Sequence, residues 1–371
     1  MKIFKCQYCS QMLFFENRTC ERCSHRLGFL AEPAELSAIE TRDGVRWRAL
    51  AAPGKTWRFC DNAERDACNW LVPADGGDRF CEACRHNRTV PDLSSEKNVR
   101  AWRQMEIAKH RLFYTLLRLR LPVPNRADDP ERGLVFDFLN DPTDPSGPKV
   151  LTGHDEGLIT LSLVEADDAE REARRTSMGE PYRTLLGHFR HEVGHYYWDR
   201  LVRDEGRLAE CRAVFGDDEA DYNEALKRHY AEGAPAGWQN SFVSTYATTH
   251  AWEDFAETWA HYLHIIDSLE TATAFGIEVH PIISGDRGLH AEAWVDPYAA
   301  GGFDRLIGEW LPLTYAMNAM NRSMGLNDLY PFVLSPAVIV KLGYIHDLAH
   351  APRTIMYQAA SSSAKRRQCS R

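Results

Sequence analysis

The chain has 371 residues, of which 44% are hydrophobic and 26% are charged, and its formal net charge is -9. This length exceeds what one small core can organise, so we expect a globular protein with two domains. The acidic total argues against a dedicated nucleic-acid binder, and no apolar run is long enough to span a bilayer. We therefore expect no membrane partner.

The N-terminus lacks the apolar core of a secretory signal, because polar residues and cysteines interrupt it at once. We therefore predict a cytoplasmic protein. Thiols stay reduced in that compartment, so clustered cysteines there indicate metal binding rather than disulfides. Eight of the ten cysteines lie within the first 84 residues.

The first four of these cysteines form two Cys-x-x-Cys pairs, Cys6 with Cys9 and Cys20 with Cys23, separated by ten residues. Each pair sets two thiolates at the spacing that a tetrahedral ion requires, so the two pairs predict a structural zinc site. Four thiolates leave no open position for chemistry. We interpret this site as a structural site that stabilises the fold, in which His25 is an alternative ligand.

The second group is Cys60, Cys68, Cys81 and Cys84, of which only the last two have the usual spacing. A second structural zinc is predicted, but ligand exchange between the two groups or replacement of a cysteine by His86 stays open. Short strands are expected near residues 34–39 and 45–50. Together these features predict a β-rich zinc ribbon over residues 1–92, in which metal compensates for a small core. A polar linker over residues 89–98 follows.

The next stretch, residues 99–121, has the periodicity of a long helix, with apolar residues at three- and four-residue steps. Its basic residues are expected on a solvated face; they are Lys109, Arg111, Arg118 and Arg120. A short strand is predicted at 134–138. Partial alternation of apolar and polar residues over 157–163 predicts an edge strand.

A His-Glu-x-x-His motif follows at His191, Glu192 and His195, within a segment of helical periodicity over residues 184–198. Positions i and i+4 share one helix face, so the two histidines can offer nitrogens to one ion. Glu192 lies about 100° round the helix, from where it can reach a water on that ion. Gly194 allows another backbone to approach closely. The alternative is two histidines that are hydrogen-bonded within a helical core.

A second helical segment, residues 250–264, carries Glu253 and Glu257 four residues apart. Two carboxylates on one helix face repel each other unless a cation or a hydrogen-bond donor lies between them. Neighbouring tryptophans and alanines predict a buried helix, where a bare carboxylate is costly. These properties favour a third metal ligand over a solvated acidic face.

The run from Glu253 to Trp259 resembles the gluzincin metallopeptidases, and most closely the corresponding helix of the anthrax-lethal-factor-like proteases. The resemblance implies that Glu253 is the third zinc ligand and that Glu257 orients a ligand histidine from the outer shell. It also implies that Tyr246, seven residues before Glu253, assists at the oxyanion. Asp254 departs from the pattern of this family, so the choice between Glu253 and Asp254 stays open.

The whole chain is similar to a bacterial group of zinc-binding metallopeptidases with an N-terminal zinc ribbon. The resemblance covers most of the chain and implies an α+β fold. A β-rich ribbon would be followed by a mainly helical, zincin-like domain over residues 99–350, and this domain would contain a small sheet. Residues 359–371 are predicted to be a disordered tail. By analogy with zinc peptidases, the strand at 157–163 would pair with extended substrate.

The predicted activity is hydrolysis of peptide bonds by a zinc-held water, with Glu192 as the base and His191, His195 and Glu253 as the ligands. We expect one catalytic and two structural zinc ions, a peptide or protein substrate, and a protein or nucleic-acid partner for the ribbon. The alternative is a zinc-ribbon adaptor whose zincin domain is a scaffold without turnover. Such a scaffold does not need Glu192. A third hypothesis is a protease that acts on protein–DNA adducts, which the negative net charge of the chain disfavours.

Overall fold

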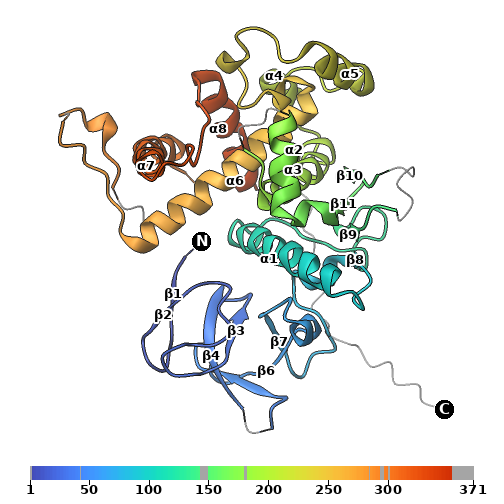
Figure 1. Ribbon diagram of the computed structural model, residues 1–371, viewed down its shortest axis with the longest axis vertical. Coiled ribbons are helices and arrows are strands. Elements are labelled where there is room, and N and C mark those ends of the chain that lie inside the picture. Colours follow the sequence, from blue (N-terminus) through green and yellow to red (C-terminus); the bar gives the residue numbers. More distant parts are fainter. Residues whose placement is uncertain are drawn as a thin grey trace.

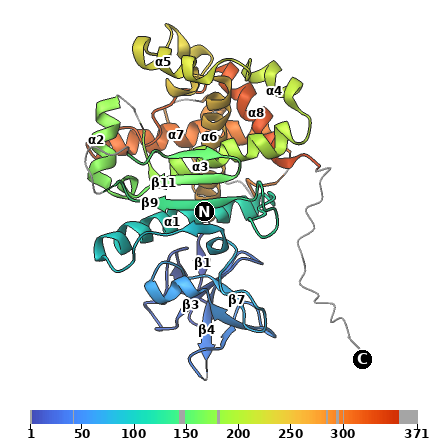
Figure 2. The same ribbon diagram turned by 90° about the vertical axis from the view of Figure 1, so that its right-hand side faces the viewer.

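The computed structural model is arranged in three tiers, which Figures 1 and 2 show from two sides. A β-rich N-terminal region lies at one end, the long helix α1 (Glu96–Arg118) crosses the middle, and the remaining helices form the other end. This arrangement confirms the predicted α+β class. The structure describes residues 2–41, 43–142, 149–178, 182–283, 285–292, 296–299 and 301–352. The predicted tail at 359–371 lies outside them.

The N-terminal region contains two antiparallel sheets. One pairs β1 (Phe4–Lys5) with β2 (Met12–Leu13), and the other has the strand order β3-β4-β5-β6-β7. The strands of the larger sheet are β3 (Leu27–Leu30), β4 (Glu35–Thr41), β5 (Trp47–Ala49), β6 (Thr56–Phe59) and β7 (Leu71–Pro73). The two strands expected near 34–39 and 45–50 are therefore confirmed as β4 and β5.

A third sheet has the order β10-β11-β9-β8, with bounds β8 (Asn87–Thr89), β9 (Val135–Leu139), β10 (Gly153–Asp155) and β11 (Leu158–Ser162). The prediction of an edge strand over 157–163 is wrong, because β11 lies between β9 and β10. A tight turn explains the difference: Glu156 and Gly157 both have positive φ, at 42° and 86°, and fold the chain back as a hairpin. The strand β8, which comes before the predicted domain boundary, pairs with β9.

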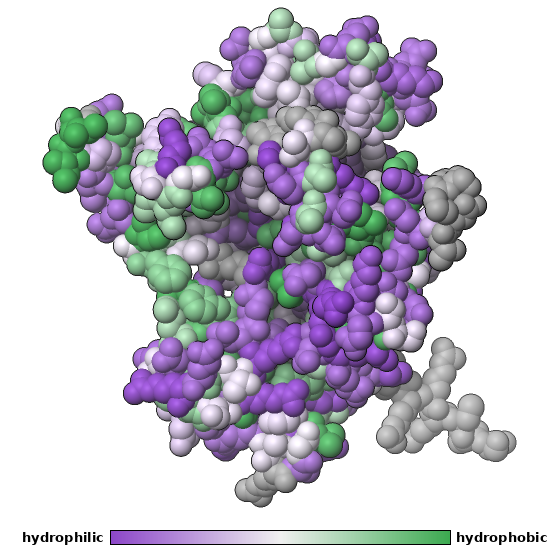
Figure 3. Space-filling view, viewed as in Figure 1, coloured by the Kyte–Doolittle hydropathy of each residue, from purple (hydrophilic) through white to green (hydrophobic). Residues whose placement is uncertain are grey.

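The helical end of the molecule is built from seven further helices among the described residues. They are α2 (Asp168–Met178), α3 (Leu185–Tyr197), α4 (Leu208–Phe215), α5 (Tyr222–Glu232), α6 (Ala251–Phe275), α7 (Phe303–Ser323) and α8 (Pro336–His350). Helices α4 and α5 are separate because Gly216 ends α4 with a φ of 97° and Asp221 caps α5. None of the described helices is both long and apolar enough to cross a membrane. The loop after α6 extends from the body (Figure 1), at a corner where the surface is coloured hydrophobic (Figure 3). Ile282 and Ile283 in this loop are fully exposed.

Helix α1 is buried on two sides, and this corrects the expectation of a solvated position for Lys109, whereas Arg111 is partly exposed and Arg120 is exposed. Lys109 is fully buried against a carboxylate one turn earlier. The reason is that α1 lies between the ribbon and the third sheet. On the ribbon side the ring of Tyr114 lies 5.4 Å from that of Phe15, and on the other side Phe113 lies 6.1 Å from Phe136 on β9.

Helices α3 and α6 approach each other closely at Gly194. A Cβ atom added there would lie 2.9 Å from the Cα of Ala256 and 3.2 Å from the Cβ of Trp259, closer than side chains pack. The ring of Tyr197 stacks on Trp259 at 4.9 Å. The sequence-based expectation of a close backbone contact at Gly194 is thus confirmed, and this contact sets the spacing between the two helices.

We predict that Gly194→Ala lowers the free energy of unfolding by about 1–3 kcal/mol, because the added methyl group forces α3 and α6 apart. Alanine is otherwise the better helix former, so Gly308→Ala in α7 is the matched control. No atom lies within 4 Å of a Cβ added at Gly308, and that variant should gain up to about 1 kcal/mol. Denaturant unfolding measures both, and a stabilised Gly194→Ala variant would contradict the packing argument.

Candidate metal centres

The first cysteine cluster has the geometry of a tetrahedral zinc site. The sulfur atoms of Cys6, Cys9, Cys20 and Cys23 all lie within 4.8 Å of one another. The two sulfur atoms lie 3.7 Å apart in the pair Cys6 and Cys23, and 3.5 Å apart in the pair Cys9 and Cys20. Zinc–sulfur bonds of about 2.3 Å in a tetrahedron require sulfur separations of about 3.8 Å. The residues therefore fit one ion, while His25 stacks on Tyr8.

The second cluster brings together Cys60, Cys68, Cys81 and Cys84, and all four are buried. The Cys68 and Cys81 sulfurs lie 3.8 Å apart, which again fits the edge of a tetrahedral site. The two groups of cysteines form separate clusters. His86, the alternative ligand, has its Nδ1 atom 2.6 Å from the carbonyl oxygen of Leu134, where it donates a hydrogen bond.

The third cluster joins the two histidines of the motif to Glu253. The Nε2 atoms of His191 and His195 lie 3.1 Å apart, and Oε2 of Glu253 lies 3.0 Å from the first and 3.3 Å from the second. Donor atoms about 2.0–2.1 Å from a tetrahedral zinc ion are separated by about 3.3 Å. The two imidazoles and the carboxylate therefore converge at the spacing that one ion requires.

The hydrogen bonds around this cluster leave lone pairs facing its centre. The Nδ1 atom of His191 donates to Oε1 of Glu257 at 2.8 Å, and Glu257 also accepts a bond from the Ser244 hydroxyl at 2.6 Å. With its proton on Nδ1, His191 directs the lone pair of Nε2 towards the cluster. No hydrogen-bond donor is directed at the buried Oε2 atom of Glu253 among the described residues. A cation between these buried acceptors would stabilise them.

The start of α6 determines where Glu253 lies. The ring of His250 caps the helix: Nδ1 accepts from the backbone N–H of Trp252 at 3.1 Å, and Nε2 donates to the carbonyl oxygen of Ala220 at 3.0 Å. The second carboxylate oxygen of Glu253, Oε1, accepts a bond from the Tyr222 hydroxyl at 2.6 Å. Of the two acidic residues that the sequence left open, Glu253 is therefore the one that reaches both imidazoles.

Its neighbour Asp254 contacts a different part of the fold. The Asp254 carboxylate is buried and pairs with Nζ of Lys341 on α8 at 2.6 Å. Burial raises the pKa of Asp254 to about 7, an effect that the Lys341 ammonium opposes. The contact with Lys341 makes Asp254 a structural partner of α8.

Glu192 lies in the same buried environment as the three donors. Burial raises the pKa of Glu192 to about 7, an effect that His191 opposes and that the carboxylates of Glu253 and Glu257 reinforce. The ring of Tyr246 lies 5.9 Å from that of His191, and burial raises the pKa of its hydroxyl far above the usual value. Tyr246 therefore remains a neutral donor near the cluster.

Several residues of this site carry no recognisable motif in the sequence. They are His154, whose ring lies 6.3 Å from that of His195, Tyr222, Ser244, and Trp252, whose ring lies 3.6 Å from that of His195. Trp252 directly precedes Glu253, so its place in the sequence indicates that it lies near the site. The other three residues are not adjacent to the ligands in sequence, and only the folded structure brings them close to the cluster. Tyr222, for example, lies at the start of α5 and reaches across to α6.

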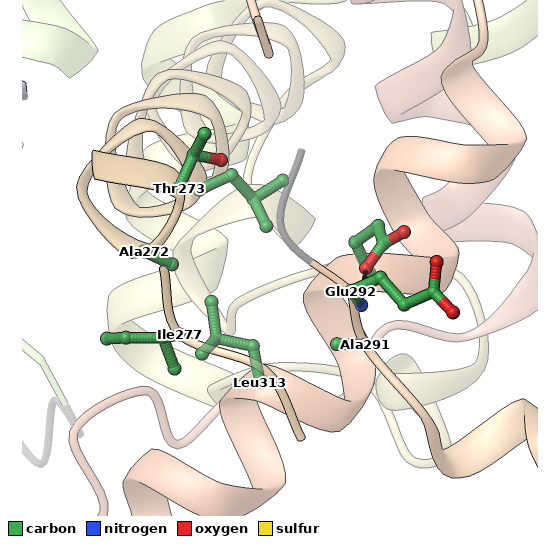
Figure 4. Close-up of a pocket in the computed structure, with 8 residues that line it drawn as sticks. Ala272, Thr273, Ile277, Ala291, Glu292 and Leu313 are labelled. Carbon is green, nitrogen blue, oxygen red and sulfur yellow. Dashed lines mark hydrogen bonds between the residues drawn. The ribbon is translucent and has the colours of Figure 1, made fainter. Parts of the chain in front are cut away.

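A shallow pocket near the opposite end of α6 is separate from these clusters (Figure 4). Its lining comes from α6, α7 and the loop between them, and comprises Leu269, Ala272, Thr273, Ile277, Ala291, Glu292, Glu309 and Leu313. At a rise of 1.5 Å per residue, about 30 Å of helix separates Thr273 from Glu253. We therefore do not assign this pocket to the metal site.

Comparison with known proteins matches both parts of the chain. A family model described as a putative zinc-binding metallo-peptidase matches residues 98–348, and a zinc-ribbon domain matches residues 3–95. Uncharacterized proteins of Mycobacterium bovis and Mycobacterium tuberculosis are 42% identical over 368 residues, which cover 96% of this chain and 100% of theirs. No solved structure matches. The chain therefore belongs to the zinc-binding metallo-peptidase family, with a zinc ribbon at its N-terminus.

Proposed function

We propose that the protein is a zinc-dependent peptidase of the gluzincin type. The observation that carries the proposal is the convergence of His191, His195 and Glu253 at 3.0–3.3 Å, with Glu192 beside them. Bound there, zinc would supply a Lewis acid and would lower the pKa of a coordinated water from about 15.7 to about 7. Two further zinc ions, one in each cysteine cluster, would be structural.

In this proposal Glu192 is the general base and then the general acid. It accepts a proton from the attacking water and passes that proton to the leaving amine. The neutral hydroxyl of Tyr246 would donate to the oxyanion, a contribution that can reach about 3 kcal/mol.

The other side chains of the site hold these groups in position. Glu257 keeps the proton of His191 on Nδ1 and so keeps Nε2 free for metal. Tyr222 fixes one oxygen of Glu253, so that the other faces the imidazoles. His191 and Glu253 thus each have a protein partner on the polar atom that faces away from the cluster, which limits the orientations that they can adopt.

Substrate would bind in an extended conformation along β10, which is an edge strand of the third sheet among the described residues and contacts α3. Pairing with a strand edge uses main-chain hydrogen bonds, so it demands little of the peptide's sequence. We further propose that the ribbon recruits the substrate or a partner, and that the protein acts in the cytoplasm. The nine described cysteines are all free, which suits a reducing compartment.

In the competing hypothesis the protein is a binding protein, and its helical region catalyses no reaction. A scaffold would need the three donors but not Glu192, and it would not need a hydroxyl donor such as Tyr246. The presence of both groups beside the donors favours an enzyme. Zinc content and turnover, measured together on the variants below, separate the two functions.

We expect wild-type protein to bind three zinc ions and Glu253→Ala to bind two, because two imidazoles alone hold zinc weakly. Elemental analysis after gel filtration measures the content. Asp254→Asn is the matched control and should keep three ions, since Asp254 contacts Lys341 rather than the imidazoles. Three ions in Glu253→Ala would contradict the assigned ligand.

Glu192→Gln should keep three zinc ions but lose hydrolysis of a peptide library by a factor of about 10²–10⁴, because the amide cannot accept the proton. The same chemical change at an exposed site, Glu224→Gln on α5, should leave the rate unchanged. Cleavage by zinc-loaded Glu192→Gln at the wild-type rate would refute the base assignment, and an inactive wild type with three ions would favour the scaffold.

The two tyrosines should differ in what their loss affects. Tyr246→Phe should lower kcat by a factor of about 10²–10³ with zinc affinity unchanged, because only an oxyanion donor is removed. Tyr222→Phe should weaken zinc binding by a factor of about 10–100, because it frees a ligand carboxylate. Chelator titration and steady-state kinetics measure the two effects, and the same defect in both variants would argue against separate roles.

A further inference from the structure

We propose that His110, on helix α1, is a fifth donor at the second cysteine cluster and an alternative to Cys60 as the fourth metal ligand. The histidine lies outside the zinc ribbon in sequence, within the region that matches the peptidase family. The proposal concerns a structural ion and is independent of the proposed peptidase activity.

The position of the His110 ring matches that of a zinc ligand. Its Nε2 atom lies 3.2 Å from the sulfur of Cys68, 3.9 Å from that of Cys81 and 3.5 Å from that of Cys84. Around one tetrahedral zinc ion, a nitrogen and a sulfur ligand are separated by about 3.5 Å. The three sulfurs and Nε2 therefore form a complete set of four donors.

Cys60 completes a second set of four with the same three sulfurs. Each of those three sulfurs contacts Nε2 of His110, whereas the Cys60 sulfur accepts a bond from the backbone N–H of Cys81 at 3.4 Å. We infer that Cys60 and His110 lie on opposite sides of the face formed by the three shared sulfurs. An ion close to this face has two candidates for its fourth ligand.

The tautomer of His110 favours coordination. Nδ1 donates to the backbone carbonyl oxygen of Glu106 at 2.6 Å, so the proton of a neutral ring lies on Nδ1 and the lone pair of Nε2 faces the sulfurs. The ring is buried, and it packs 5.2 Å from that of Trp70 in the ribbon. The side chain is therefore already in the orientation that binding requires.

The consequence of this ligand is a metal link between the two parts of the chain. Cys68 and Cys84 belong to the ribbon, while His110 lies one turn before Phe113, which contacts Phe136 on β9. An ion held by His110 would join the ribbon directly to the helix that supports the third sheet. Loss of the Cys60 thiolate would then leave both the ion and this junction in place.

Zinc counting on the full-length chain tests the proposal. Cys60→Ala should keep all three ions, and His110→Ala should also keep three because Cys60 is then available. The double variant Cys60→Ala/His110→Ala should bind two. The matched control, Cys60→Ala/His25→Ala, removes a histidine beside the first cluster and should keep three.

Cobalt substitution provides a second readout that a purely structural histidine would not change. Cobalt in Cys60→Ala should give a tetrahedral absorption spectrum with weaker thiolate charge transfer than in His110→Ala, because one sulfur has been replaced by nitrogen. A Cys60→Ala chain that binds two ions or does not fold overturns the proposal. A double variant that still binds three ions overturns it as well. If Cys60→Ala binds only two ions, His110 is a hydrogen-bond donor to the thiolates and not a ligand.

Discussion

The close contact between α3 and α6 is the constraint on which the candidate site depends. His191 and His195 come from one helix and Glu253 from the other, so the three donors can meet only if the two backbones nearly touch. The absence of a side chain at Gly194 permits this approach. A larger separation would lengthen both carboxylate–imidazole distances together. The packing of an apolar helix interface thus determines the geometry of a polar site.

The N-terminal region is connected to that interface through a continuous series of aromatic contacts. Phe15 of the ribbon packs on Tyr114 of α1, and the adjacent Phe113 packs on Phe136 of β9. Phe136 in turn lies 5.7 Å from Phe189 on α3, two residues before His191. Because α1 lies between the ribbon and the sheet, the ribbon forms part of the support for the helices that carry the three donors.

Sequence reasoning succeeded where the signal is local. The periodicity around His191 and the spacing of Cys6 and Cys9 are properties of a few consecutive residues, and both segments have the expected structure. It failed where the fold brings distant residues together. Tyr222 reaches Glu253 from another helix, and Lys109 is buried because two separate layers cover α1. The hairpin at Gly157 was missed because β10 pairs with β11 and makes it an inner strand, while the sequence of β11 keeps the partial alternation of an edge strand.

The histidine cap at the start of α6 has an electrostatic consequence for the metal centre. Because the helix begins at Ala251, Glu253 lies in its first turn, where the aligned peptide dipoles place a partial positive charge. That field stabilises a nearby carboxylate by about 0.3–1 kcal/mol, and by up to about 2 kcal/mol when it is partly buried. The Glu253 carboxylate thus lies at the end of the helix where its ionised form is least costly.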